Sequence, residues 1–451
     1  MRELIKSAFT LPWALSMVGA QQLANLVAPP AEGRIAGATA ALDAVSQAAE
    51  RQLDGWLDEA LEIGDTMRQG LADLTALRAP SLDSSGLMSL ATDPRLWSLV
   101  QATSDYWLMP AARLDALRLD SEDRSPALQE LTNKLRILRL IVQMPSDLDL
   151  DHNDARPLPA LVERAAWFEA DERLWAVEAL GTYAGDRALQ HGGGADPQDV
   201  LTDESTAALP PWSLTMLHAG LGISFATLVL APLDPSSSPD LLRHGITRFA
   251  ALCRRSARRG YVGTSLESLG LVARALHRSL VPLLAREIQR VEPGLHEYFW
   301  HGVGRALYVD PTYALPSSNA PRRAVADLAL ETDDPMAYRN ALSGLAWEAT
   351  AVNLQNPEIM EFVLRHHAVL VADNDAFSDG VSSALVVQHD TVPNDPHIAA
   401  FVSHEPRTRA AAEAWRAQVT IPCRIALERT YDEWRQGWAM DRLFRCRPGS
   451  A

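Results

Sequence analysis

The apolar residues of this chain recur with helical spacing, most regularly between residues 42 and 77. Eleven apolar positions follow one another there at intervals of three or four residues, with a mean of 3.5. Charged and amide side chains occupy the positions between them. This spacing is typical of a coiled-coil seam, so we expect residues 29–78 to form an amphipathic helix that packs against another helix. That helix belongs either to the same chain or to a second copy in a homo-oligomer.

Residues 7–27, which precede this seam, contain no charged side chain. A helix over residues 1–28 has a narrow polar strip and a wide apolar face, formed by Leu4, Phe9, Leu11, Trp13, Leu15, Val18, Leu23 and Leu26. Such a face fits a helix that lies on a hydrophobic surface (lipid or granule) or against a protein partner. Packing of the same helix into the chain's own core fits the pattern equally well.

Two further interpretations of this leader are weaker. A membrane span is disfavoured because Pro12 leaves an uninterrupted helix of only about 24 Å, which is short for the hydrocarbon core. A cleaved secretory signal is suggested by Arg2, Lys6 and the small residues at 18–20, but Glu3 and Pro12 count against it. We therefore expect a cytoplasmic protein that is peripherally attached to a membrane or granule.

The uncharged leader and the alanine-rich amphipathic helix after it together resemble the phasins, small proteins that coat polyester storage granules. The resemblance covers residues 1–78 and is one of composition. It implies that this end of the chain attaches to a hydrophobic surface.

Residues 79–159 form a connector in this scheme, with one helix expected over residues 129–142. The stretch from Pro145 to Pro159 carries four aspartates. A calcium-binding EF-hand loop needs glycine at its sixth position and glutamate at its twelfth, whereas His152 and Leu158 stand there, counting from Asp147. We therefore expect an acidic linker.

Short motifs centred on glycine recur through the C-terminal two-thirds of the chain. The leading residues are Gly181, Gly220, Gly263, Gly302, Gly344 and Gly380, spaced 39, 43, 39, 42 and 36 residues apart. A period near 40 without an alternating strand pattern predicts a pair of helices per unit, and small residues let neighbouring helices approach closely. We expect an all-α fold, with a helical-hairpin repeat domain at residues 160–390 and a closing helix and tail at residues 391–451.

Four of these segments carry a second resemblance: Tyr183–Gly185, His218–Gly222, His301–Leu307 and Ser343–Ala346. In this order they are similar to an uncharacterised bacterial family found beside enediyne and other polyketide genes. The match spans about residues 165–385. It implies a shared fold and a place in specialised metabolism, and it transfers no catalytic residue.

Composition narrows the possible functions. The 451 residues are 47 % hydrophobic and carry a formal charge of −16, which argues against nucleic acid as a partner. Cys253, Cys423 and Cys446 are too few and too scattered for a disulfide framework or a cysteine-based zinc site. Cys446 falls in a tail that we expect to fray.

Catalytic motifs are absent from the sequence. It has no phosphate-binding loop and no nucleophile elbow. His296 and His301 are five residues apart, whereas the zinc-protease motif places its histidines four apart. We therefore predict no catalytic residue, no metal and no cofactor.

If the repeat encloses a pocket, its polar lining should come from the glycine-rich segments, and the candidates are His218, His301, Arg305, Glu348 and Asn353. A satisfied polar residue at a helix contact is the simpler interpretation of each. We expect a non-enzymatic scaffold or binding protein that is attached through its N-terminus. The alternative is an enzyme or ligand-binding accessory of specialised metabolism. A pocket above about 300 Å³ with convergent polar groups favours the alternative, and a filled interior favours the scaffold.

Overall fold

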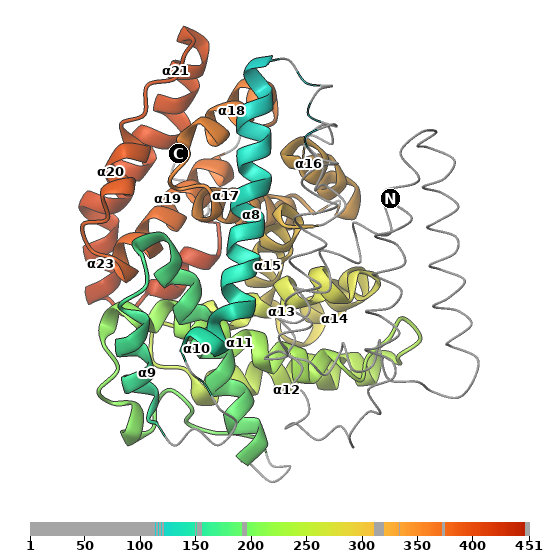
Figure 1. The fold of residues 1–451 in the computed structure, drawn as a ribbon. Helices are drawn as coiled ribbons and strands as arrows, with labels where there is room; N and C mark the ends of the chain where they lie inside the picture. The colour runs from blue at the N-terminus through green and yellow to red at the C-terminus, as the bar shows by residue number, and fades with distance from the viewer. Residues whose placement is uncertain are drawn as a thin grey trace, which may run out of the picture.

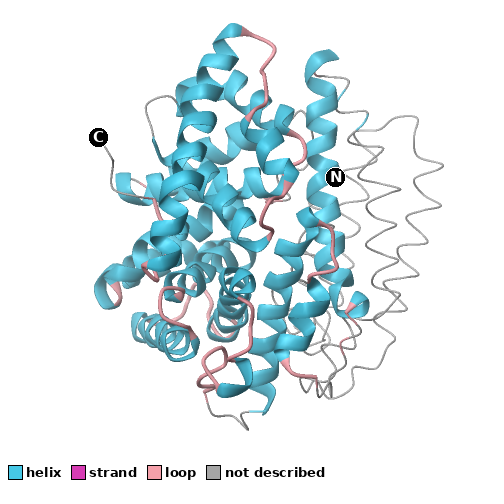
Figure 2. Cartoon of the chain, turned by 90° about the vertical axis from the view of Figure 1, so that its left-hand side faces the viewer, coloured by secondary structure: helices cyan, strands magenta, loops and turns pink. Residues whose placement is uncertain are grey.

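A computed structural model describes residues 121–446 except 149, 151–155, 192–195, 311–319, 333 and 372–374, together with residues 113, 116 and 119. Over this part the chain is all-α, as predicted, and contains no strand (Figures 1 and 2). The first helices are α8 (Ser121–Asp147), α9 (Leu158–Ala165), α10 (Ala170–His191), α11 (Leu214–Leu230), α12 (Pro239–Ser256), α13 (Val262–Leu276), α14 (Val281–Val291) and α15 (His296–Tyr308). They are followed by α16 (Ala320–Glu331), α17 (Pro335–Val352), α18 (Pro357–Val371), α19 (Asp375–Thr391), α20 (Pro396–Val402), α21 (Arg409–Trp415), α22 (Ile421–Ile425) and α23 (Tyr431–Gln436). A 3-10 turn, η10 (Met440–Phe444), comes last.

Six helices form the centre of the fold, and we call them the inner ring: α10, α11, α13, α15, α17 and α19. Each packs along the next in chain order, and α19 returns to contact both α10 and α11. Two hydrogen bonds hold this closure. The Gln388 side-chain amide donates to the Ala170 carbonyl (2.8 Å), and the Thr215 hydroxyl donates to Asp390 (2.9 Å).

The helices of the inner ring are buried on nearly every side, which their composition explains. In α11, Leu214–Leu230 contains no acidic or basic residue other than His218, and most of its side chains are inaccessible to solvent. The stretch Pro211–Leu230 is long and apolar enough to cross a membrane, but it is mostly buried within the fold. Helices apolar on all sides are typical of the core of a large domain. By contrast, α12 and α14 bury one face and expose charged residues on the other.

Glycines lie where neighbouring helices of the inner ring come closest. A Cβ atom at Gly304 would overlap the Ala341 carbonyl, and one at Gly344 would overlap the His301 carbonyl. The same relation holds for Gly181 with Leu217, Gly220 with Glu178, Gly302 with Glu267, and Gly380 with Ser343. Gly263 differs, because its neighbour is the ring of Tyr298 rather than a main chain. The spacing of these helices is therefore set by backbone contact.

Helix α8 is longer than the sequence pattern indicated. It begins at Ser121 rather than near residue 129, and it continues through Pro145 to Asp147. Proline in a helix removes one N–H donor and crowds the preceding turn, yet α8 contains both Pro126 and Pro145. Pro145 lies only two residues from the C-terminal end of α8, so the linker expected from Pro145 onward starts later.

The C-terminal segment also departs from expectation. A helical run from Arg409 to Gln436 includes two π turns, and η10 then folds back against α13, α15 and α19. Cys446, which we expected to lie in a frayed tail, is buried, and its N–H donates to the Asn340 side chain at 2.7 Å. For Cys446 the expectation of a frayed tail was wrong, because residues 440–446 pack into the core.

One continuous hydrophobic core joins α8 to the C-terminal segment, so residues 160–390 and the part after them pack as a unit. The apolar helix at residues 1–28 with its eight interfacial positions, the seam at 29–78 and the start of the connector lie outside the described residues.

Candidate functional site

Arg305 of α15 lies at the centre of the inner ring, bonded to three carboxylates. It donates to Glu348 of α17 at 2.7 Å and to Glu267 of α13 at 3.1 Å. A third bond, of 3.3 Å, reaches Glu178 of α10. All four side chains are at most 6 % exposed. We call these four residues the central cluster.

Aromatic packing fixes the Arg305 guanidinium. Its carbon atom lies 4.2 Å from the centre of the Trp347 ring, where the cation is attracted to the π face. The planar guanidinium therefore presents its edge to the carboxylates and its face to the indole. Arginine suits this position better than lysine, since it directs several donors in one plane.

Burial and mutual repulsion separate the pKa values of the three glutamates. Burial, together with the charges of Glu348 and Glu267, raises the pKa of Glu178 to about 7 despite the opposing effect of Arg305. Burial also raises the pKa of Glu348. For Glu267, burial is outweighed by Arg305 and His301, so its pKa is lowered. Burial acts against the charge of Arg305, but the three carboxylates together raise its pKa. Glu178 is therefore the member that exchanges a proton near neutral pH.

His301 extends the cluster toward the C-terminal segment. Its Nδ1 lies 2.8 Å from the Glu267 carboxylate, and its ring packs edge-on against Phe444, with 6.0 Å between ring centres. Phe444 also packs against Trp347. Among the described residues, His301 Nε2 and Trp347 Nε1 have no hydrogen-bond partner. Phe444 therefore covers the cluster on the side of η10.

Helix α8 covers the cluster from another side. Its Asn133 amide donates to the side chains of Asn353 (3.0 Å) and Asn356 (2.9 Å), and Asn353 donates to the Tyr308 hydroxyl (2.6 Å). Lys134 is paired with Glu130 at 2.9 Å and lies over the Tyr308 ring. Arg136 pairs with Asp171 of α10, and Asp123 pairs with Arg365 of α18.

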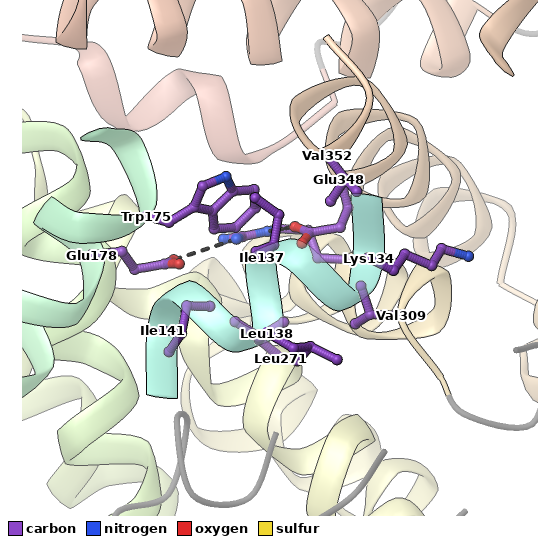
Figure 3. A pocket seen from close by; sticks show the side chains of 11 residues that line it. Lys134, Ile137, Leu138, Ile141, Trp175, Glu178, Leu271, Val309, Glu348 and Val352 are labelled. Carbon is purple, nitrogen blue, oxygen red and sulfur yellow. Dashed lines mark hydrogen bonds and ion pairs between the residues drawn. The ribbon is translucent and has the colours of Figure 1, made fainter. Parts of the chain in front are cut away.

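A small cavity of about 20 Å³ lies between α8 and the central cluster (Figure 3). Its lining residues are Lys134, Ile137, Leu138 and Ile141 of α8 and, opposite them, Trp175, Glu178, Leu271, Arg305, Val309, Glu348 and Val352. A volume of this size holds about one water molecule. The space has apolar walls and a charged floor, and α8 covers it.

The structure places the sequence-derived candidates in two regions. His301, Arg305 and Glu348 meet in one hydrogen-bonded group through Glu267, and Asn353 lies beside it under α8. His218 has separate partners: its Nε2 accepts from the Arg258 N–H at 2.9 Å, and its ring stacks on Tyr261. Burial lowers the pKa of His218 to about 4, so this ring is neutral and serves packing. Its side-chain partners in the described structure, Leu214, Arg258 and Tyr261, all lie outside the cluster.

Three members of the site were missed from sequence: Lys134, Glu178 and Glu267. Two of them lie close to a motif glycine, Glu178 three residues before Gly181 and Glu267 four residues after Gly263. Arg305 and Glu348 follow their own glycines by three and four residues. Side chains three or four residues apart share a helix face, so the distance from the glycine was a usable signal.

The hydrogen-bond donors and acceptors of the central cluster determine which groups it can bind. Three of the five N–H donors of Arg305 are bonded to carboxylates, and the glutamates retain capacity to accept further hydrogen bonds. Within the described ranges, no group of three or more His, Cys, Asp or Glu residues is placed to hold a metal ion. The floor of the cavity is thus an acceptor-rich surface with one exchangeable proton. Comparisons with protein families, with curated proteins and with solved structures found no match to this chain.

Proposed function

We propose that this protein binds a small ligand at the centre of its inner ring, in the space between α8 and the central cluster. The observation that carries the proposal is the convergence of Glu178, Glu267 and Glu348, from three helices, on Arg305 of a fourth, in a site that α8 covers. This is the ligand-binding alternative drawn from the sequence, and the convergent polar groups support it. The present cavity, about 20 Å³, is far below the threshold of about 300 Å³ set above, so its volume alone favours the scaffold, and a ligand larger than water requires α8 to shift.

Energetics favour a functional explanation of the cluster. Taking charges out of water costs several kcal/mol per ion, and well-packed apolar residues often replace a buried ion pair with no loss of stability. Most of the surrounding core is made of Leu, Val, Ala and aromatic side chains, although the inner helices also bury serines and threonines and the Arg274–Asp310 ion pair. Ionisable groups with shifted pKa values next to a cavity are typical of binding and catalytic sites.

We also propose that the inner ring is built from helical-hairpin repeats, each of which contributes one inner helix. Five of the six helices bear a motif glycine against a neighbouring main chain, which supports one unit per inner helix. The intervening α12, α14, α16 and α18 then serve as the second helices of successive units. The similarity of residues 165–385 to a family beside polyketide genes suggests specialised metabolism as the source of the ligand.

The test uses the full chain and a panel of eight-carbon probes: octylamine, octanoic acid and octanol. Binding is measured by native mass spectrometry and calorimetry on the wild type and on Ile141→Trp, which fills the cavity from the half-buried face of α8. Leu330→Trp, at an 86 % exposed position on α16, is the matched control.

We expect at least one probe to bind the wild type and Leu330→Trp equally, and to bind Ile141→Trp at least tenfold more weakly. Val309→Phe, on the opposite wall, gives the same result by an independent change. Absence of binding by every probe, or equal binding by Ile141→Trp, overturns the proposal.

A second function is proposed for the N-terminal residues on the strength of their sequence alone. The uncharged leader at residues 7–27 supports attachment to a lipid, granule or protein surface. Deleting residues 1–28 should move the protein from the particulate to the soluble fraction of a cell extract. Unchanged partitioning rejects this attachment.

A further inference from the structure

We infer that the ligand of the central site is an organic cation, with a protonated amine or ammonium group directed at Glu178 and Glu348 and an apolar body along the face of α8. The inference rests on the proposed ligand-binding function and specifies its chemistry. It follows from the balance of charges around the cavity and from the composition of its walls.

Carboxylates outnumber cations in the central cluster and the α8 residues beside it, although the side chains that line the cavity itself carry two of each, Lys134 and Arg305 against Glu178 and Glu348. Arg305 faces three carboxylates, and the other nearby cation, Lys134, is already paired with Glu130. Two cations thus stand against four carboxylates. Even a protonated His301 leaves the carboxylates in excess. An additional positive charge therefore improves the electrostatics of the site, whereas an additional negative charge worsens them.

The same geometry argues against an anionic ligand. An anion would need free donors, but three of the five N–H groups of Arg305, one each at Nε, Nη1 and Nη2, already end on glutamate oxygens. Displacing one carboxylate from Arg305 would leave that carboxylate buried without its cation, which is costly. A cation needs no such displacement, because carboxylate oxygens accept more than one hydrogen bond.

The walls of the cavity define the rest of the ligand. Ile137, Leu138 and Ile141 form one face of α8, and Leu271, Val309 and Val352 lie opposite them. Trp175 adds an aromatic surface beside Glu178 (Figure 3), and aromatic faces attract ammonium groups. A linear or cyclic hydrocarbon body attached to the amine matches these walls, and it enters as α8 moves outward.

Binding of a cation should release protons from the site, and this release can be measured. Burial raises the pKa of Glu178 to about 7, so part of this carboxyl population is protonated near neutral pH. Glu348, Glu267 and Arg305 are the charged groups that act on it directly. An ammonium group beside the carboxylate favours its ionised form, so complex formation should release protons at pH 7. A carboxylate ligand has no reason to release one.

The experiment compares octylamine with octanoic acid on the full-length protein at pH 7, by calorimetry in two buffers of different ionisation enthalpy. We expect the amine to bind at least tenfold more tightly and to release protons. Glu178→Gln and Glu348→Gln should each weaken the amine at least tenfold without affecting octanol. Glu413→Gln, at a site exposed to solvent, is the control that retains wild-type affinity.

Glu178→Asp serves as the second variant, since it keeps the charge and should retain amine binding more fully than Glu178→Gln. If octanoic acid or octanol binds as tightly as the amine, the cation inference is overturned while ligand binding stands. If no probe binds, the proposed function itself fails. If the amine binds equally to Glu178→Gln, Glu348→Gln and the control, the positive charge lies elsewhere and the inference is rejected.

Discussion

Arg305 on α15 and Glu178 on α10 meet at 3.3 Å across the centre of the inner ring, although 127 residues separate them along the chain. The pair exists only if the intervening helices α11 and α13 curve the chain around a common centre. Breaking it therefore tests both the closure of the ring and the energetics of its charged core.

Replacing Arg305 with methionine should lower the free energy of unfolding by about 3–5 kcal/mol at pH 8, since it leaves three carboxylates buried without their cation. The loss should shrink toward pH 5, where those carboxylates take up protons. Urea denaturation at both pH values measures the effect. Arg409→Met, which removes an exposed ion pair with Glu413, should cost less than about 1 kcal/mol. A loss below about 1 kcal/mol for Arg305→Met at pH 8 contradicts this account.

Gly304→Ala tests the backbone contact between α15 and α17. The added methyl group would overlap the Ala341 carbonyl, so the two helices must separate, at a cost of about 1–3 kcal/mol or more. Gly245→Ala in α12 is the matched control, because its Cβ would make only an ordinary contact with Leu233. There the higher helix propensity of alanine should stabilise the protein by up to about 1 kcal/mol. Thermal melts of both variants give the comparison, and equal shifts would count against backbone-limited packing.

Glu178→Gln should change how stability depends on pH. The pKa of Glu178 is raised by burial from 4.5 to about 7, so the folded protein holds this proton more tightly than the unfolded chain. Its stabilising contribution is complete below pH 4.5 and is lost as the pH rises through 7. A shift of this size corresponds to about 3 kcal/mol at most.

The glutamine variant lacks this titration. Relative to the wild type it should therefore become steadily more stable between pH 5 and pH 8, and melting temperatures across that range measure the trend. A constant difference between the two proteins means that Glu178 has an ordinary pKa.

Phe444→Ala should remove the cover on the η10 side of the cluster. The ring packs against both His301 and Trp347, and truncation of a buried phenylalanine costs about 3–5 kcal/mol. Because Cys446 is buried two residues away, we also expect its thiol to react faster with a maleimide under native conditions. Ile421→Ala, at a 45 % exposed position, should leave both stability and labelling unchanged. Wild-type labelling rates in the Phe444 variant would mean that the chain end is held by other contacts.

Sequence reasoning reached the helical class and the positions of close helix contact. Glycine inside a helix is costly, so its recurrence at Gly220, Gly302 and Gly344 indicated a packing requirement, and each of these residues meets a neighbouring main chain. Local pattern was sufficient because the requirement is local, one small residue per crossing.

The charged centre was only partly accessible from sequence. Arg305 and Glu348 were singled out, but Glu178 and Glu267 were not, because glutamate on a helix is most often a surface residue. These two glutamates face the centre of the ring only because of the way all six inner helices are arranged, and a short stretch of sequence does not reveal that arrangement. Phe444 was missed for a similar reason: an aromatic residue near the end of a chain becomes a core residue only where the ring leaves a space to fill.

Main-chain contact at the glycines sets the spacing of the inner helices independently of the side chains at the centre of the ring. Where carbonyl oxygens in contact with glycine α-carbons set the distance between neighbouring helices, exchanging Glu178 or Trp175 changes the chemistry at the centre of the ring without changing its width. Under the proposed ligand-binding function, substitutions at a few central positions would change ligand selectivity while the spacing of the helices stays the same.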